Sequence, residues 1–291
     1  MTPVMTLEPT PIIAVQEEPL VEPDESQLIT EDNTPVDSIF AEKQMRLLTE
    51  SLHSSWPGPD GKNLYVAMAN VCLFYNPKVP PLVPDMLLSL GVTYPENIRL
   101  KQNHSYFVWN YSKPPDVVIE IVSNRVGGEA TTKFETYAKI GVAFYVIFDP
   151  EHHLSDDTLR IFYRNGSSYK PMDGMWFPSV SLGLTLWHGE YERGEDIWLR
   201  WCDQNGQVIP SGAEASELER QRANAETQRA ESEKQRAESE KQRADTETQR
   251  AENEKQRADT ETQRAENEKL RADQFLILLR QHGIELPVEK L

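Results

Sequence analysis

The stretch PPDVVIEIVSNRVGGEATTKFETYAKIGVAFYVIFDP, from Pro114 to Pro150, decides the fold of this chain. Its β-branched run Val117–Val122 predicts a strand that is buried on both faces. After a loop that contains glycine, the apolar spacing of Thr132–Ile140 predicts a helix, and Gly141 fits the position just beyond its end. The apolar run Val142–Phe148 predicts a second strand. The stretch is therefore predicted to form a strand, a helix and a strand in succession.

An acidic residue, Glu120, interrupts the first of these strands. It shares one strand face with Asp116, Val118 and Val122, because residues of equal parity point the same way. A carboxylate in the middle of a buried strand is costly unless a metal ion or another cation compensates its charge. Lys133 lies in the first turn of the predicted helix, where it can lean back over the end of the strand. The helix dipole favours anions in that turn, so a lysine there points to a specific role.

The net charge of −17 is unevenly distributed along the 291 residues. Residues 1–37 carry 9 acidic and no basic side chains, whereas residues 38–210 and residues 211–291 each carry 19 acidic and 15 basic ones. No part has the basic excess that is typical of strong binders of the phosphate backbone. If nucleic acid is the substrate, its affinity must come from a local patch.

Cysteine content and hydropathy predict a cytoplasmic protein. Cys72 and Cys202 are too few for a disulfide framework, which fits a reducing compartment. No apolar run approaches the roughly 18–20 residues of a membrane span, and the N-terminus lacks the basic region of a signal peptide. The acidic, proline-rich residues 1–37 are predicted to be disordered, with a partner-binding motif around Pro11–Val15 as the alternative.

Residues 38–210 hold all six tryptophans and are predicted to form the globular domain. Asp37 and Ser38 are suited to cap a helix over Ile39–Leu52. A hairpin is predicted around Gln204-Asn205-Gly206. Apolar and aromatic runs predict further strands at Leu64–Met68, Val71–Tyr75, Leu82–Leu90, Tyr106–Trp109, Leu159–Tyr163, Tyr169, Val180–Trp187, Ile197–Cys202 and Gln207–Ile209. The domain is therefore predicted to be of the α/β class.

A seven-residue repeat begins at Gln221, as in QRAESEK and QRADTET, and fills most of residues 211–274. Its composition favours helix. Each heptad offers only one apolar residue, an alanine, where a coiled coil normally has two larger ones. Two interpretations stay open: an alanine-seamed coiled coil, or a single solvated helix with Glu–Arg and Glu–Lys pairs. Residues 275–291 change character and form a short apolar segment that can dock or self-associate.

Three charged residues carry the candidate chemistry. Asp85 lies in the apolar run Leu82–Leu90, Glu120 lies in the central strand, and Lys133 follows it. Two carboxylates suit Mg²⁺, which keeps several waters and takes few protein ligands. A nearby lysine can orient or deprotonate a water and neutralise charge on a phosphate. The alternative is that Asp85 marks a strand end, Glu120 is paired and Lys133 is solvated.

Other polar and aromatic residues are weaker candidates. His152, His153 and His188 lack the spacing of a zinc site. Ser123 either hydrogen-bonds near the site or turns the chain. The aromatic residues Tyr106, Trp198 and Trp201 are predicted to belong to the core rather than to a base-stacking platform.

Residues 38–210 resemble the Uma-type restriction endonucleases, a bacterial family in the PD-(D/E)XK nuclease superfamily. The resemblance rests on Pro84-Asp85, on Pro114–Ser123, on Lys133 and Tyr137, and on Gly141–Pro150. It implies a restriction-endonuclease-like core with a mixed central sheet flanked by helices, followed by a long C-terminal helix or coiled coil. It also implies that Asp85 and Glu120 hold Mg²⁺, for which Mn²⁺ can substitute, and that Lys133 completes the catalytic site.

The chain departs from the superfamily pattern at Val122, where a lysine is expected two residues after the acid. The resemblance assigns that role to Lys133 on the helix instead. Glu129 and Glu50 occupy positions where related nucleases carry further site acids, but a solvated surface position is favoured for both.

Two functions follow from these observations. The first is an Mg²⁺-dependent endonuclease that hydrolyses DNA phosphodiester bonds through Asp85, Glu120 and Lys133. The second is a nuclease-like fold that serves as a binding or assembly module, with the C-terminal helix as the site of homo-oligomerisation. No membrane partner is expected.

Overall fold

The computed structural model describes residues 25, 28–30, 38–125, 128–281 and 283. The chain forms two compact units, Met1–Ser216 and Glu217–Leu291. The disorder predicted for residues 1–37 falls outside the described residues, except at residues 25 and 28–30. Most of the predicted apolar segment beyond Gln281 falls outside them as well.

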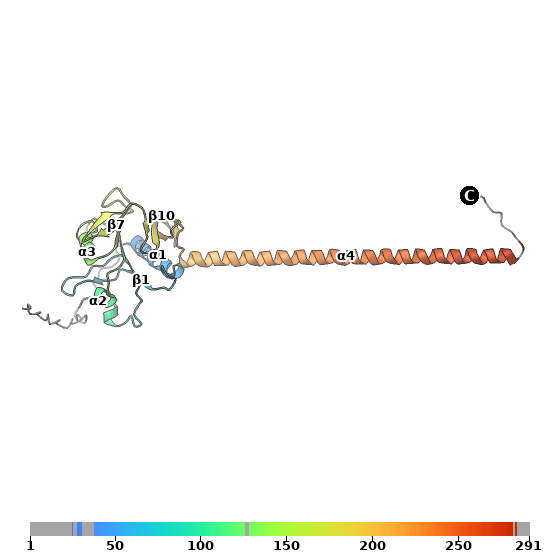
Figure 1. Cartoon of the computed structure of the whole chain (residues 1–291). Helices are drawn as coiled ribbons and strands as arrows, with labels where there is room; N and C mark the ends of the chain where they lie inside the picture. Colours follow the sequence, from blue (N-terminus) through green and yellow to red (C-terminus); the bar gives the residue numbers. More distant parts are fainter. Residues whose placement is uncertain (1–24, 26–27, 31–37, 126–127, 282, 284–291) are drawn as a thin grey trace, which may run out of the picture. The chain divides into compact units, whose positions relative to one another are not determined.

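A six-stranded mixed sheet forms the centre of the first unit, in the order β1-β3-β5-β6-β7-β8. Figure 1 labels β1 and β7 of this sheet. β5 and β6 are parallel, and the other neighbouring pairs are antiparallel. The strands are β1 Tyr65–Ala69, β3 Met86–Leu90, β5 Val117–Ile121, β6 Phe144–Phe148, β7 Leu159–Asn165 and β8 Ser168–Pro171. The predicted α/β fold with a mixed central sheet is therefore confirmed.

The parallel pair β5 and β6 is joined by the helix α3, Thr132–Ile140, as the sequence predicts. Parallel neighbours need such a crossover because a tight turn cannot connect them. Gly141 ends the helix in the left-handed region, with φ of +105°. A side chain is disfavoured there, and a Cβ would also lie 3.3 Å from the ring of Pro114. These features fix where β6 begins relative to β5.

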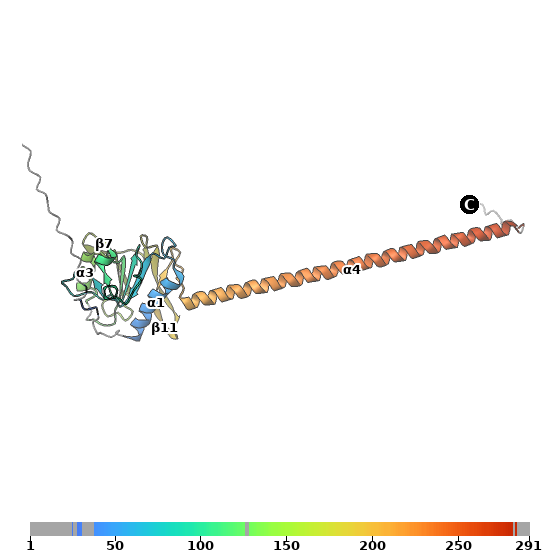
Figure 2. The same cartoon turned by 90° about the horizontal axis from the view of Figure 1, so that it is seen from below.

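Helices cover the two faces of the sheet, as Figure 2 shows for α1 and α3. The predicted N-terminal helix is confirmed as α1, Ile39–Ser55, and Ser38 Oγ caps it by accepting from the Ala41 N–H at 3.0 Å. On the α1 face, Ile119 and Val146 belong to one buried cluster with the apolar side of that helix. On the α3 face, the buried cluster contains these residues: Leu87, Val118, Val122, Tyr137, Tyr145 and Ile147.

Two smaller sheets complete the first unit. The order β11-β10-β9 is formed by β11 Gly194–Cys202, β10 Leu182–Tyr191 and β9 Trp176–Phe177, whose apolar side chains join the α1-side cluster. β2, Leu73–Phe74, pairs in parallel with β4, Tyr106–Phe107. The turn Lys101–Asn103 is a 3₁₀ helix.

The structure corrects three local predictions. The run Leu82–Leu90 becomes a strand only at Met86, so Asp85 precedes the strand instead of lying within it. The predicted strand Tyr106–Trp109 stops at Phe107, because the chain turns into the short helix α2, Val108–Tyr111.

The third correction concerns the strand predicted at 207–209. The predicted turn does fold the chain back, because Val208 bridges Cys202 in antiparallel fashion and the Ile209 N–H donates to the Trp201 carbonyl at 2.8 Å. The segment 207–209 is not itself a strand, and the strand partner of β11 is β10.

The helix α4, Gly212–Gln281, confirms the long C-terminal helix. Its start is capped reciprocally: Glu214 accepts from the Ser211 N–H at 2.8 Å, and Ser211 Oγ accepts from the Glu214 N–H at 3.3 Å. Arg200 of β11 donates to both carboxylate oxygens of Glu214. The first turn of α4 is thus bonded to β11.

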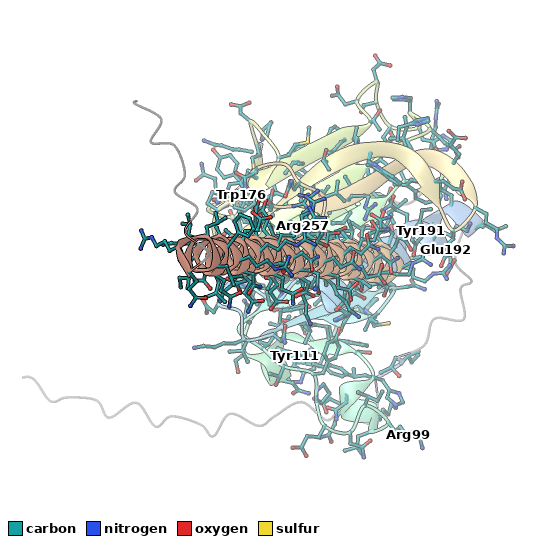
Figure 3. All side chains as sticks on the ribbon, turned by 90° about the vertical axis from the view of Figure 1, so that its right-hand side faces the viewer. Arg99, Tyr111, Trp176, Tyr191, Glu192 and Arg257 are labelled. Atoms are coloured by element: carbon teal, nitrogen blue, oxygen red, sulfur yellow. The ribbon has the colours of Figure 1, made fainter. Side chains whose placement is uncertain are left out.

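No described residue of α4 is buried. Figure 3 shows its side chains standing out around the helix, with Arg257 labelled. The described part of the chain contains no helix with the length and apolar character needed to cross a membrane.

Candidate active site

The pairing of β3 with β5 brings the two candidate acids together. Met86 lies opposite Ile119 in this antiparallel pair, so continuing the register by one residue places Asp85 opposite Glu120. Opposite residues in adjacent strands point to the same side of the sheet. That side is the α3 side, because Leu87 and Val118, two residues away from each acid, belong to the cluster under α3.

Asp85 also closes the end of the β3–β5 ladder. Its Oδ2 accepts a hydrogen bond from the Ile121 N–H at 2.6 Å, and its carbonyl accepts one from the Asn70 N–H at 3.1 Å. Asp85 therefore links the ends of β1, β3 and β5, to β5 through its carboxylate and to the residue after β1 through its backbone carbonyl, which agrees with the interpretation of Asp85 as a strand-end residue.

Glu120 is 1% exposed and is held from both sides of its carboxylate. Its Oε2 accepts from Lys133 Nζ at 2.8 Å, and its Oε1 accepts from the Tyr137 hydroxyl at 2.7 Å. Lys133 and Tyr137 are four positions apart on α3, so they occupy the same helix face. This spacing explains how one short helix supplies both partners.

Glu129 lies in the loop before α3 and contacts the same lysine, with Oε1 3.3 Å from Lys133 Nζ. It is 8% exposed, and its backbone carbonyl accepts from the Tyr145 hydroxyl at 2.9 Å. The expectation of a solvated surface position is therefore wrong for Glu129, because the cation of Lys133 stabilises a buried carboxylate there. Its Oε2 is buried without a hydrogen-bond partner among the described residues.

The electrostatics of the site are dominated by burial. Burial raises the pKa of Glu120 to about 8, the charge of Lys133 opposes this rise, and the charge of Asp85 adds to it. Burial alone lowers the pKa of Lys133, but Glu120 and Glu129 outweigh it and raise the pKa, so the amine is an ammonium ion. Burial, together with Glu120, raises the pKa of Tyr137, which keeps its hydroxyl a donor.

The carboxylates fit a divalent cation. Asp85 and Glu120 offer hard oxygen ligands on the same side of adjacent strand ends, and carboxylate oxygens retain lone pairs after accepting the bonds described above. Among the residues that the structure describes, no cluster of three or more His, Cys, Asp or Glu side chains is arranged to hold a metal. Mg²⁺ typically takes one or two carboxylates and completes its shell with water, so two acids suffice.

Other candidates lie elsewhere. Glu50 lies on α1, where its Oε1 accepts from the Gly212 N–H at 2.7 Å, so it contacts the start of α4. His153 Nε2 lies 3.0 Å from Glu151 Oε2, and His188 lies in β10. Tyr106, Trp198 and Trp201 are buried, which confirms their assignment to the core.

The sequence predicts Tyr137 only as part of the apolar side of its helix and of the family motif. In the structure, the Tyr137 hydroxyl donates a hydrogen bond to the Glu120 carboxylate. The signal was its spacing of four residues from Lys133, which places the two side chains on one face.

Comparison with known families gives a match. The model of the Uma2 family, described as "Putative restriction endonuclease", matches residues 27–187. This range covers more than half of the chain and includes every strand of the central sheet, and the chain belongs to this family of restriction-endonuclease-like nucleases. α4 lies beyond the matched range. A comparison with curated proteins gave no match.

Proposed function

We propose that the protein is an Mg²⁺-dependent endonuclease that hydrolyses DNA phosphodiester bonds, with Asp85 and Glu120 as metal ligands and Lys133 as the cationic catalytic residue. The observation that carries the proposal is the convergence of these three residues from two strand ends and a helix. Glu120 is opposite Asp85 by register, and Lys133 Nζ is 2.8 Å from Glu120 Oε2. Membership of the Uma2 family supports the same reaction class.

Each side chain has a defined task in this proposal. Asp85 and Glu120 bind the metal through oxygens whose orientation is fixed by the Ile121 N–H and by the Tyr137 hydroxyl. When bound, Mg²⁺ lowers the pKa of a water and stabilises negative charge on the phosphate. Lys133 is paired with two carboxylates and carries a positive charge, so it stabilises the negative charge that develops on the phosphate oxygens.

The test is cleavage of supercoiled plasmid and of single-stranded DNA by the full chain, with Mg²⁺ or Mn²⁺. Asp85→Asn, Glu120→Gln and Lys133→Met are expected to lower the rate by at least about 100-fold, the scale on which a lost charge-stabilising group acts.

Asp116→Asn is the matched control. Asp116 flanks the other end of β5 on the same strand face, pairs with Lys113 and accepts from the Leu90 N–H at 2.7 Å. Its variant should cleave at the rate of the unaltered chain. Equal residual cleavage in all five proteins contradicts the proposal and indicates a contaminating nuclease.

A second candidate function is assembly of several copies through α4. Its end carries large exposed apolar side chains, with Phe275 62%, Ile277 56% and Leu278 52% exposed. In the described residues of the repeat, 221–269, no ion pairs form within the helix, although the predicted solvated single helix was expected to have them. The charges of the repeat are therefore free to pair with another copy.

The period of the repeat supports the same candidate. An alanine at every seventh residue drifts by about 20° per heptad around a straight helix, so only a left-handed supercoil keeps these alanines in one seam. Light scattering on the full chain is expected to give a multiple of 33.3 kDa. Leu276→Glu together with Leu279→Glu should reduce it to one chain, and a single-chain mass for the unaltered protein contradicts assembly.

A further inference from the structure

Arg160 lies on the same side of the central sheet as the candidate active site. Glu120 pairs with Ile147 across β5 and β6, and Ile147 pairs with Arg160 across β6 and β7. Residues in register on adjacent strands point the same way. The neighbours agree: Phe162 packs in the α3-side cluster and Ile161 in the α1-side cluster. Asp85, Glu120, Ile147 and Arg160 therefore form one row across four strands.

The guanidinium of Arg160 has unused hydrogen-bond donors. Its Nε and Nη2 are buried, and none of the described residues accepts a hydrogen bond from either atom. No carboxylate of a described residue lies within ion-pair distance of it. Buried polar groups are nearly always paired, and a charged donor without an acceptor is especially costly. The fold thus retains a cation whose Nε and Nη2 have no acceptor among the described residues.

A neighbouring arginine on the same strand does have a hydrogen-bond acceptor. Arg164 lies four positions later, on the same face of β7, and its Nε donates to the Ala138 carbonyl at 2.9 Å. Arg200 of β11 is buried as well and is paired with Glu214. Arg200 Nε is also buried without an acceptor among the described residues, but the Arg200 guanidinium has a carboxylate partner, whereas Arg160 has none there.

We propose that Arg160 is a substrate-binding residue whose Nε and Nη2 edge binds a phosphate of the DNA strand held at Glu120. This inference rests on the proposed nuclease function. Arginine donates two parallel hydrogen bonds to phosphate through such an edge. Adjacent strands are about 4.8 Å apart, so the Arg160 backbone lies about 10 Å from that of Glu120. The side chain is only partly buried, so a rotamer change brings the edge to a phosphate that neighbours the scissile one.

The charge distribution supports this assignment. The domain of residues 38–210 has no basic excess, so DNA affinity must come from a few well-placed cations. Lys133 is already paired with Glu120 and Glu129. Arg160 is a cation in the same row whose Nε and Nη2 donate to none of the described residues.

The test measures binding of a labelled DNA duplex to the full chain over a range of salt concentrations. Glu120→Gln is present throughout, so that cleavage does not consume the probe. Arg160→Met is expected to weaken binding about tenfold and to reduce the slope of log K against log salt by about 0.9, the contribution of one phosphate contact. Arg164→Met is the matched control and should leave the slope unchanged.

Thermal unfolding of the same variants separates a substrate contact from a structural role. Arg160→Met removes unpaired buried donors, so its Tm should equal or exceed that of the unaltered chain. An unchanged salt slope, or a slope reduced equally by Arg164→Met, overturns the proposal. A lower Tm for Arg160→Met together with an unchanged slope assigns Arg160 a structural role and also overturns it.

The two proposals fail in different ways. Cleavage by the unaltered chain tests nuclease activity, whereas the salt slope tests Arg160. If no DNA is cleaved with either metal while Arg160→Met still loses the phosphate contact, the binding role stands and the hydrolytic function fails.

Discussion

Lys133 Nζ lies 2.8 Å from Glu120 Oε2, although 13 positions separate the two residues and one is on α3 while the other is the next-to-last residue of β5. The side chains are 22% and 1% exposed, respectively. A buried carboxylate at the centre of a sheet is tolerated because a cation from the following helix reaches it. The same pair lies next to Asp85, so the residues that stabilise this buried charge also form the candidate site.

Above the pKa of about 8 of Glu120, where this acid is ionised, Lys133→Met should lower the free energy of unfolding by about 3 kcal/mol, because removing one partner leaves a buried carboxylate uncompensated. Urea unfolding measures the loss. The double variant Lys133→Met with Glu120→Gln should recover part of it, since the uncompensated charge is then gone. Lys139→Met is the control, because its pair with Glu135 is exposed at 67% and 71% and should contribute less than about 0.5 kcal/mol. Equal losses of unfolding free energy in Lys133→Met and Lys139→Met would contradict a larger contribution from the buried pair.

Above the pKa of about 8 of Glu120, Tyr137→Phe should cost about 2 kcal/mol of unfolding free energy, because the lost hydrogen bond then goes to a charged acceptor. Tyr169→Phe provides the comparison. Its hydroxyl donates to the neutral Val142 carbonyl at 3.0 Å, so its loss should cost about 1 kcal/mol. Chemical denaturation of both variants gives the two values, and a larger loss at Tyr169 contradicts the role given to the Tyr137 hydroxyl.

The first turn of α4 should lose stability in acid through Glu214. Hydrogen bonds from Arg200 hold the pKa of Glu214 below its usual 4.5. A lowered folded-state pKa contributes stability that is fully present above the unfolded value and is lost as the pH falls through the folded one. The stability difference between the unaltered chain and Glu214→Gln should therefore be constant above about pH 5.5 and decline below pH 4.5. Unfolding curves from pH 7 to pH 3 test this, and a difference that grows toward low pH contradicts it.

Local sequence patterns were sufficient to predict the central unit. The limits of α3 and its end at Gly141 agree with the prediction residue for residue, because apolar spacing and a left-handed glycine are local signals. The position of Lys133 over the strand end follows from the length of the connecting loop. The long helix α4 follows in the same way from its repeat.

Contacts that depend on strand pairing were not predictable from the sequence. The sequence does not indicate the position of Arg160, because its alignment with Glu120 depends on two successive registers, β5 with β6 and β6 with β7. Glu129 looked like a solvated acid because only the folded loop brings it to Lys133 and Tyr145. Glu50 is separated from its partner Gly212 by 162 positions, so its place at the start of α4 was equally hidden.

The most direct test of the central claim is the anomalous scattering of manganese in crystals of the full chain soaked with Mn²⁺. The account predicts one strong peak that contacts carboxylate oxygens of both Asp85 and Glu120, and its loss in Asp85→Asn crystals. Manganese bound elsewhere, with no peak between these two acids in the unaltered chain, would contradict the proposed metal site and the hydrolytic function built on it.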